Sequence, residues 1–332
     1  MKAVLPFSPE SPGVIAVGEV AAPALGPGEV RIRTAAAGLN RADLLQMRGH
    51  YPPPPGSSSV PGLEVSGVIA ELGEGVQGHR VGDRVMALLA GGGQAAEVVV
   101  PAGQLMAVPG NLTLAEAAAI PEAALTSWTN LVVEGGLLAG ESVLVTGATS
   151  GIGTFAVQMI RDLGGRVVAA ARSRERLERL REFGVDRLVT LDSDYPRRVR
   201  DLTDGKGVDL VLDLVAGEWL APTLECMRLR GRLILVGITA GRQAQIDLGV
   251  VLRQRLRIVG SVLRARPAGE KAELVRGFAS WGLPRIADGR LRPVVDRTFP
   301  LAGAAAAYAR LEHERPLGKV LLICDAQGGS TP

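Results

Sequence analysis

Hydrophobic and polar residues alternate in short runs along the first third of the chain, and Gly and Pro separate these runs. In residues 29–34 (EVRIRT), Val30 and Ile32 fall on one face and two arginines on the other, which is typical of a half-buried strand. Residues 38–51 (GLNRADLLQMRGHY) predict a short helix that Asn40 caps. Similar alternation predicts further strands at residues 64–70, 84–88 and 96–100.

Between residues 142 and 260, apolar runs bounded by Gly turns alternate with helical patterns. We expect strands buried on both faces with helices of about 10 to 12 residues between them, and hence a parallel sheet with right-handed crossovers. Six such strands predict a doubly wound dinucleotide-binding domain. The strands are expected at residues 143–146, 166–171, 187–191, 209–214, 232–236 and 257–259.

After residue 260 the alternation stops. The remaining chain predicts two more helices, an extended stretch between them, a last strand and a frayed end. These segments are expected at residues 269–281, 302–312, 292–300, 319–324 and 327–332, respectively.

Composition limits the function classes. A chain of 332 residues with 47% hydrophobic residues can build two packed domains and is not disordered. Its net charge of +3 is no argument for a nucleic-acid partner. The two Cys cannot build a disulfide framework, which indicates a reduced compartment, and together with the three His they barely supply one metal site. No signal peptide or membrane-spanning run is recognised, so we expect a cytoplasmic protein.

The strongest local motif is a glycine loop at residues 143–153 (VLVTGATSGIG), in which an apolar run leads into Gly147, Gly151 and Gly153 and then into a helical pattern. Glycines let the backbone approach a pyrophosphate, and a helix N-terminus offers free N–H groups to it. The spacing G-x-x-x-G-x-G, set in a six-strand alternation, predicts a dinucleotide site.

The end of the second strand of this domain predicts which cofactor binds. An NAD enzyme places Asp or Glu there for the ribose, but this chain has Arg172 and Ser173. Both side chains can hydrogen-bond a 2′-phosphate, so NADPH is favoured. The arginines that follow, such as Arg179 and Arg181, are interpreted as a solvated helix face.

Several motifs together resemble the zinc-independent quinone oxidoreductases of the medium-chain dehydrogenase/reductase superfamily, and within them a tumour-suppressor-induced subgroup. The resemblance covers essentially the whole chain. Besides the glycine loop, it is carried by residues 38–43 (GLNRAD), 49–56 (GHYPPPPG), 61–67 (PGLEVSG), 81–85 (VGDRV), 118–126 (AAIPEAALT), 260–264 (GSVLR) and 318–321 (GKVL).

This resemblance implies a GroES-like, β-rich catalytic domain at residues 1–122 and 264–332, a Rossmann NADP-binding domain at 123–263, and an active cleft between them. Zinc enzymes of the superfamily carry Gly-His-Glu where this chain has Leu63 before Glu64. Leu63 cannot bind a metal, and no Cys precedes Cys226, so no metal is expected. Without a Lewis acid, the acceptor must already be electrophilic, such as a quinone or an enone.

The resemblance also implies the site residues. Tyr51 and Asn40 are the candidate catalytic donors to the acceptor carbonyl, although Asn40 serves equally as a helix cap, and Asp43 is expected to fix local backbone. Lys319 lies near the cleft or is only a strand-end charge. Further cofactor contacts are expected at Thr126, Gly147, Ser150, Gly151, Ile152, Gly153, Gly237, Ile238, Ser261, Val262 and Leu263. Leu45 and Leu191 replace polar or aromatic residues of some relatives, which implies a more apolar pocket.

Three alternatives compete with this interpretation. The loop also fits short-chain dehydrogenases, but none of Tyr51, Tyr195 and Tyr308 has the Lys four residues later that this class needs. An NADPH-dependent enone or enoyl reductase on the same scaffold stays open. A nucleic-acid-binding protein is disfavoured because the arginines are dispersed. By resemblance, we expect a homodimer or homotetramer with a small-molecule substrate and no membrane partner.

Overall fold

The computed structural model describes residues 1–314 and 316–324, so the predicted frayed end at 327–332 lies outside the described residues. The chain forms two compact units, residues 1–125 with 264–332 and residues 126–263. The first boundary falls within helix α3 (Pro121–Trp128). Each unit has its own sheet.

The unit at residues 126–263 is built on a six-stranded sheet in the order β10-β9-β8-β11-β12-β13, with every neighbouring pair parallel. Its order reverses between β8 and β11, which is the strand order of a Rossmann fold. The predicted α/β doubly wound class is confirmed. The strands are β8 (Ser142–Thr146), β9 (Arg166–Ala171), β10 (Arg187–Thr190), β11 (Val208–Asp213), β12 (Met227–Leu235) and β13 (Arg257–Gly260).

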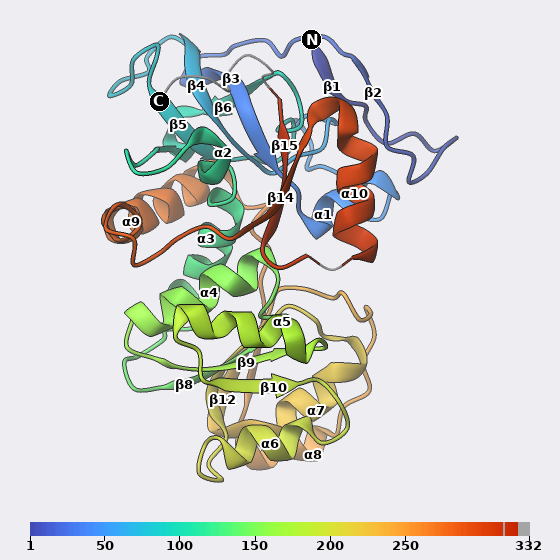
Figure 1. Cartoon of the computed structure of the whole chain (residues 1–332), viewed down its shortest axis with the longest axis vertical. Helices are drawn as coiled ribbons and strands as arrows, with labels where there is room; N and C mark the ends of the chain where they lie inside the picture. The colour runs from blue at the N-terminus through green and yellow to red at the C-terminus, as the bar shows by residue number, and fades with distance from the viewer. Residues whose placement is uncertain (315, 325–332) are drawn as a thin grey trace. The chain divides into compact units, whose positions relative to one another are not determined.

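Helices cover both faces of this sheet, with α4 and α5 on one side and α6, α7 and α8 on the other (Figure 1). Apart from α4, these helices have five to seven residues, so the expected length of about 10 to 12 was wrong for them. Loops and 3₁₀ turns such as η3 (Arg179–Phe183) complete the crossovers. The helices are α4 (Gly151–Asp162), α5 (Arg174–Glu178), α6 (Tyr195–Asp201), α7 (Leu220–Glu225) and α8 (Leu248–Gln254).

Two strands depart from the prediction. β13 is not buried on both faces, because it is the edge strand and pairs only with β12. β12 begins at Met227, five residues before the predicted strand at 232, but its regular pairing with β11 starts only at Arg232. The intervening residues 228–231 (RLRG), with two arginines and a glycine, hide this early start in the sequence.

The other unit contains a seven-stranded mixed sheet in the order β14-β15-β3-β4-β5-β7, and β6 also pairs with β3. Alternating strand residues such as Val30, Ile32 and Val65 form its core, as the period-2 pattern predicted. β1 and β2 form a separate pair. The strands are β1 (Lys2–Val4), β2 (Val17–Glu19), β3 (Glu29–Gly38), β4 (Glu64–Leu72), β5 (Arg84–Leu88), β6 (Glu97–Pro101), β7 (Leu105–Ala107), β14 (Val295–Pro300) and β15 (Lys319–Ile323).

Among the described residues of this unit, four helices accompany the sheet: α1 (Arg41–Met47), α2 (Leu114–Ala117), α9 (Ala268–Ala287) and α10 (Ala304–His313). α1 and α10 pack on the same apolar cluster, which includes Leu44 and Tyr308. α9 extends past the predicted end at residue 281, because Gly282 and Pro284 are accommodated inside it. None of the helices described combines the length and the apolar character needed to cross a membrane.

Candidate functional site

The glycine loop leaves the carboxyl end of β8, beside the point where the strand order reverses. Gly147 has φ +66°, a left-handed conformation that suits glycine. Ser150 caps α4, and its hydroxyl accepts from the N–H of Gly153 at 3.1 Å. A Cβ on Gly153 would lie 2.5 Å from the Gly147 carbonyl oxygen, so only glycine lets α4 start this close to the strand. The loop therefore has the geometry of a pyrophosphate cradle.

Asp213 supports this loop, a role that the sequence analysis did not predict. Its Oδ1 accepts from the Thr146 hydroxyl at 2.6 Å and from the N–H groups of Val215 and Ala216, both at 3.0 Å. Its other oxygen is buried and has no partner within the described residues. Thr146 directly precedes Gly147, so Asp213 ties the start of the loop to the neighbouring strand. A carboxylate that ends an otherwise apolar strand is the signal that could have found it.

Arg172 and Ser173 follow β9 directly, at the edge of the sheet that also carries the glycine loop. Arg172 is exposed. The hydroxyl of Ser173 accepts from the N–H of Arg176 at 3.3 Å and thereby caps α5. Ser173 has therefore a local structural role whether or not it also binds a phosphate.

The remaining cofactor candidates of this unit gather at the carboxyl ends of the same parallel strands. Gly237 and Ile238 follow β12, and the residues from Ser261 to Leu263 follow β13. Ile238 and Val262 are exposed, whereas Ser261, Leu263 and Thr126 are buried. In open α/β sheets this is the edge at which ligands bind.

In the other unit, Glu64 forms a buried ion pair with Lys319, and Asn40 bonds to both. Both charged side chains are at most 4% exposed. The amide of Asn40 donates to Glu64 Oε1 at 3.0 Å and accepts from Lys319 Nζ at 2.6 Å. Glu64 Oε2 accepts from the backbone N–H of Glu122 at 2.9 Å. These three side chains are thus committed to one another, and neither the partner of Glu64 nor that of Lys319 was foreseen from the sequence.

Asp43 lies beside this network and holds two backbone segments. Its carboxylate accepts from the N–H of Asn40 at 2.8 Å and from the N–H of Gly62 at 3.1 Å. The side chain of Asn40 points instead to Glu64 and Lys319, so the residue that fastens the start of α1 is Asp43. The structure agrees with the expectation that Asp43 fixes local backbone.

Asp43 should impose a pH dependence on stability. Burial raises the pKa of Asp43 to about 6, although hydrogen bonds and the charges of Lys319 and Arg264 oppose this. Between about pH 4 and 6 the folded protein therefore holds more protons than the unfolded chain, so stability falls as pH rises. In urea unfolding, the stability of wild type relative to Asp43→Asn should fall by up to about 3 kcal/mol from pH 4 to pH 7. A difference that stays constant across this range would contradict the account.

Arg264 holds Tyr51 in place. Arg264 is buried and ends the GSVLR motif at residues 260–264, and the sequence predicted no role for it. The guanidinium of Arg264 lies 5.1 Å from the centre of the Tyr51 ring and donates to the Tyr51 carbonyl at 3.2 Å. It also donates to the Ala90 carbonyl at 2.7 Å and to Gln46 Oε1 at 2.6 Å. Burial raises the pKa of the Tyr51 hydroxyl above its ordinary value, so the hydroxyl is protonated at neutral pH.

Leu63, which stands in the Gly-Leu-Glu motif, is buried in this unit. Over residues 1–314 and 316–324, no three His, Cys, Asp or Glu side chains are grouped so that they could hold a metal ion. A nicotinamide cofactor would instead meet the glycine loop and the strand ends described above.

Two family models match the chain, one for each part. The model described as an alcohol dehydrogenase GroES-like domain matches residues 26–125, and the model described as a zinc-binding dehydrogenase matches residues 151–279. The first match lies in the unit with the mixed sheet, and the second lies mainly in the Rossmann unit. The predicted GroES-like and Rossmann architecture is confirmed.

Two curated relatives match the chain over most of their own length. It is 30% identical over 305 residues to the quinone oxidoreductase-like protein 2 homolog of Nematostella vectensis, covering 90% of this chain and 82% of the relative. It is 32% identical over 319 residues to the human synaptic vesicle membrane protein VAT-1 homolog, covering 91% of this chain and 81% of the relative.

Solved structures of the same fold include an alcohol dehydrogenase, a quinone oxidoreductase and an enoyl reductase. An NAD-dependent alcohol dehydrogenase superposes with a TM-score of 0.85 at 31% identity, covering 98% of this chain and 100% of the other. A Pseudomonas syringae quinone oxidoreductase gives 0.85 at 26% identity, covering 97% and 100%. The JamJ enoyl reductase gives 0.86 at 25% identity, covering 98% and 99%. The chain belongs to the medium-chain dehydrogenase/reductase superfamily of nicotinamide-dependent oxidoreductases, and quinone oxidoreductase-like proteins are among its relatives.

Proposed function

We propose that this protein transfers hydride from NADPH to quinones without a metal ion. The observation that carries the proposal is the buried pair of Glu64 and Lys319. At the motif where zinc members of the superfamily place His and Glu, this chain has apolar Leu63, and the following carboxylate is neutralised by an ammonium group. An acceptor that is already electrophilic, as a quinone is, suits a site without a Lewis acid.

The Rossmann unit supplies the proposed cofactor site. We infer that the N–H groups at the start of α4 bind the pyrophosphate, and that Arg172 with Ser173 binds the 2′-phosphate. The candidates that follow β12 and β13, together with Thr126, would contact the rest of the cofactor. When bound, NADPH supplies the hydride. All other contributions in this proposal come from side chains and backbone groups of the chain.

The mixed-sheet unit supplies the proposed acceptor contacts. A protonated Tyr51 hydroxyl can donate a hydrogen bond to the quinone oxygen as negative charge develops there. The carbonyl contact and the stacked guanidinium of Arg264 restrict the orientation of Tyr51. Asn40 and Lys319 are bound to Glu64, so we assign them the positioning of this region. After hydride transfer, solvent supplies the proton that completes the hydroquinone.

The donor role of Tyr51 is tested by Tyr51→Phe, which keeps the ring under Arg264 and removes only the hydroxyl. We expect kcat with a quinone to fall by about tenfold or more, because a donor to the developing oxyanion is lost. The Kd for NADPH should not change. Unchanged turnover and unchanged KM for the quinone would refute the role.

The choice of cofactor is tested by Arg172→Ala. Loss of a charge-assisted hydrogen bond should weaken NADPH binding by about tenfold and leave NADH binding nearly constant. Titrations of both cofactors measure this. Arg179→Ala removes an equal charge from an exposed position on η3 and serves as the control. A preference for NADPH that survives Arg172→Ala would show that the 2′-phosphate is bound elsewhere.

An NADPH-dependent enone or enoyl double-bond reductase is the second candidate, and the similarity to the JamJ enoyl reductase structure favours it. Both reactions deliver hydride to a carbon conjugated with a carbonyl, so the scaffold alone does not separate them. Rates of NADPH oxidation with ortho- and para-quinones, set beside rates with enones, separate them directly. Turnover of enones but not of quinones would replace the first proposal with the second.

A homodimer or homotetramer and a cytoplasmic location complete the proposal; both stay predictions.

A further inference from the structure

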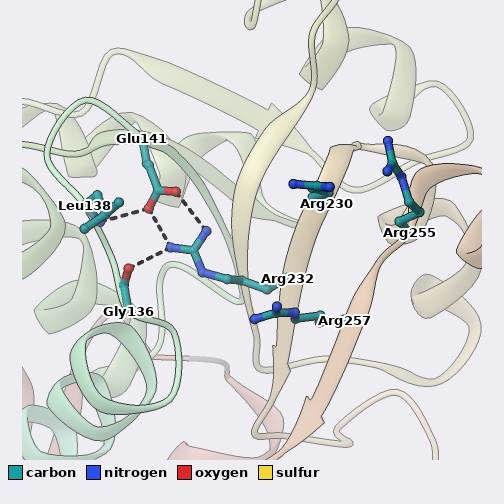
Figure 2. Close-up of a pocket in the computed structure, with 7 residues that line it drawn as sticks. All are labelled: Gly136, Leu138, Glu141, Arg230, Arg232, Arg255 and Arg257. Carbon is teal, nitrogen blue, oxygen red and sulfur yellow. Dashed lines mark hydrogen bonds and ion pairs between the residues drawn. The ribbon is translucent and has the colours of Figure 1, made fainter.

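The Rossmann unit contains a cavity of about 600 Å³ that the proposed function does not use (Figure 2). Four arginines and one carboxylate line it: Arg230 and Arg232 from β12, Arg255 from the end of α8, Arg257 from β13, and Glu141 before β8. All of these residues lie at or near the amino ends of β8, β12 and β13. The glycine loop follows the carboxyl end of β8, so the cavity lies at the opposite edge of the same parallel sheet.

Glu141 and Arg232 satisfy each other. The guanidinium of Arg232 donates to both carboxylate oxygens of Glu141, at 2.9 and 2.5 Å, as Figure 2 shows. The same guanidinium donates to the carbonyl of Gly136 at 3.0 Å. Leu138 adds a backbone N–H to Glu141 at 2.9 Å. Among the described residues, Glu141 is the only carboxylate that lines the cavity, and it is engaged by its own partners.

The other three arginines have no such partner among the residues that the structure describes. Within the described part of the chain, no hydrogen bond or ion pair holds the guanidinium groups of Arg230, Arg255 or Arg257, and all three residues are exposed. In Figure 2 no dashed line reaches them. Three unpaired positive charges around one hollow produce a positive potential that attracts anions.

The backbone has a positive φ at two of these arginines. Arg230 has φ +62°, a region that residues other than glycine rarely adopt, whereas the φ of +50° at Arg255 is the left-handed conformation in which α8 ends. Arg230 also lies in residues 228–231, which β12 inserts between its pairings of Met227 with Val208 and of Arg232 with Leu210. The conformation of Arg230, which no helix end explains, is of the kind that clusters at binding sites.

We propose that this cavity binds a compact polyphosphate, such as the triphosphate chain of a nucleotide or free tripolyphosphate. Planar guanidinium groups match phosphate oxygens in pairs, and three unpaired forks suit a chain with three or more negative charges. The cavity volume lies in the range of small-molecule sites. This site is separate from the cofactor site because it occupies the other edge of the sheet.

Calorimetric titration of the full chain with tripolyphosphate at 0.15 M salt tests the proposal, with and without NADPH. With NADPH present, which occupies the proposed pyrophosphate and 2′-phosphate contacts, we expect one saturable site, and this site should keep its Kd when NADPH is left out. The double variant Arg230→Gly and Arg257→Gln should raise this Kd by about a hundredfold, at about tenfold for each arginine. Glycine is chosen at residue 230 because it suits the positive φ of Arg230. Thermal unfolding is the check that the double variant folds. The single variant Arg255→Gly tests the arginine at the end of α8, and it should raise the Kd for tripolyphosphate by about tenfold.

Arg179→Gln, which removes one exposed charge from η3 outside the cavity, should leave the Kd unchanged. A parallel titration with ATP distinguishes the two sources: tighter binding of ATP assigns a nucleotide, and equal binding assigns the phosphate chain alone. The proposal would be overturned by any of four results: no saturable binding, loss of binding with NADPH, an equal Kd in the double variant, or equal weakening by Arg179→Gln.

Discussion

Replacement of Lys319 by Met is expected to lower the free energy of unfolding by about 3 to 5 kcal/mol, because it leaves the carboxylate of Glu64 buried without its partner. Glu64 is fully buried, and the ammonium of Lys319 is the only cationic group paired with it among the described residues. Asn40 and the N–H of Glu122 would still donate to Glu64, but neither carries a charge. Urea unfolding at pH 7 measures the loss.

The matched double variant Lys319→Met with Glu64→Gln removes both charges together. It should recover most of the lost stability, since the penalty arises from the unpaired charge. Lys206→Met changes an exposed lysine and should alter stability by about 0.5 kcal/mol at most. A loss below about 1 kcal/mol for Lys319→Met would contradict the role of the pair. With the fold restored, the double variant also tests Lys319 as a cofactor contact: a raised Kd for NADPH would support that role.

A methyl group at residue 153 is expected to abolish most cofactor binding. In Gly153→Ala the new Cβ would lie 2.5 Å from the Gly147 carbonyl oxygen and 2.6 Å from the backbone of Ala148. Backbone atoms cannot move aside as a flexible side chain can, so the loop and α4 must separate. Displacement of the N–H groups by about 1 Å would misalign them with the pyrophosphate. We therefore expect the Kd for NADPH to rise on the order of 100-fold.

Gly269→Ala is the control for this substitution. Gly269 lies in the first turn of α9, as Gly153 lies in the first turn of α4, but an added Cβ there meets no atom within 4 Å. It should bind NADPH like the wild type. If Gly153→Ala binds NADPH normally, the pyrophosphate does not sit on this loop.

The sheet of the Rossmann unit could be predicted from the sequence because its strands are apolar runs bounded by Gly turns. Prediction failed where packing within the unit, and not the local sequence, determines where a strand begins or a helix ends. The arginines before the predicted strand at 232–236 conceal that β12 begins at Met227. Gly282 and Pro284 are helix breakers in the sequence, yet α9 continues through them because the helix is packed against its own unit.

The candidate site was predictable in part. The glycine loop is a local motif, and its strand, turn and helix follow one another along the chain. The Glu64 to Lys319 pair joins residues 255 positions apart, taking 319 minus 64, so no local spacing reveals it. Arg264 and Asp213 likewise act on distant segments, Tyr51 and Thr146. Contacts of this kind depend on sheet pairing, which a single sequence does not specify.

The most direct test of the account is hydride transfer by enzyme dialysed against a metal chelator. We predict that the dialysed protein oxidises NADPH with an ortho-quinone, forms one hydroquinone for each NADPH, and keeps the rate of the untreated enzyme. Loss of turnover on dialysis with recovery on addition of Zn²⁺, or no NADPH oxidation with any quinone, would contradict the account.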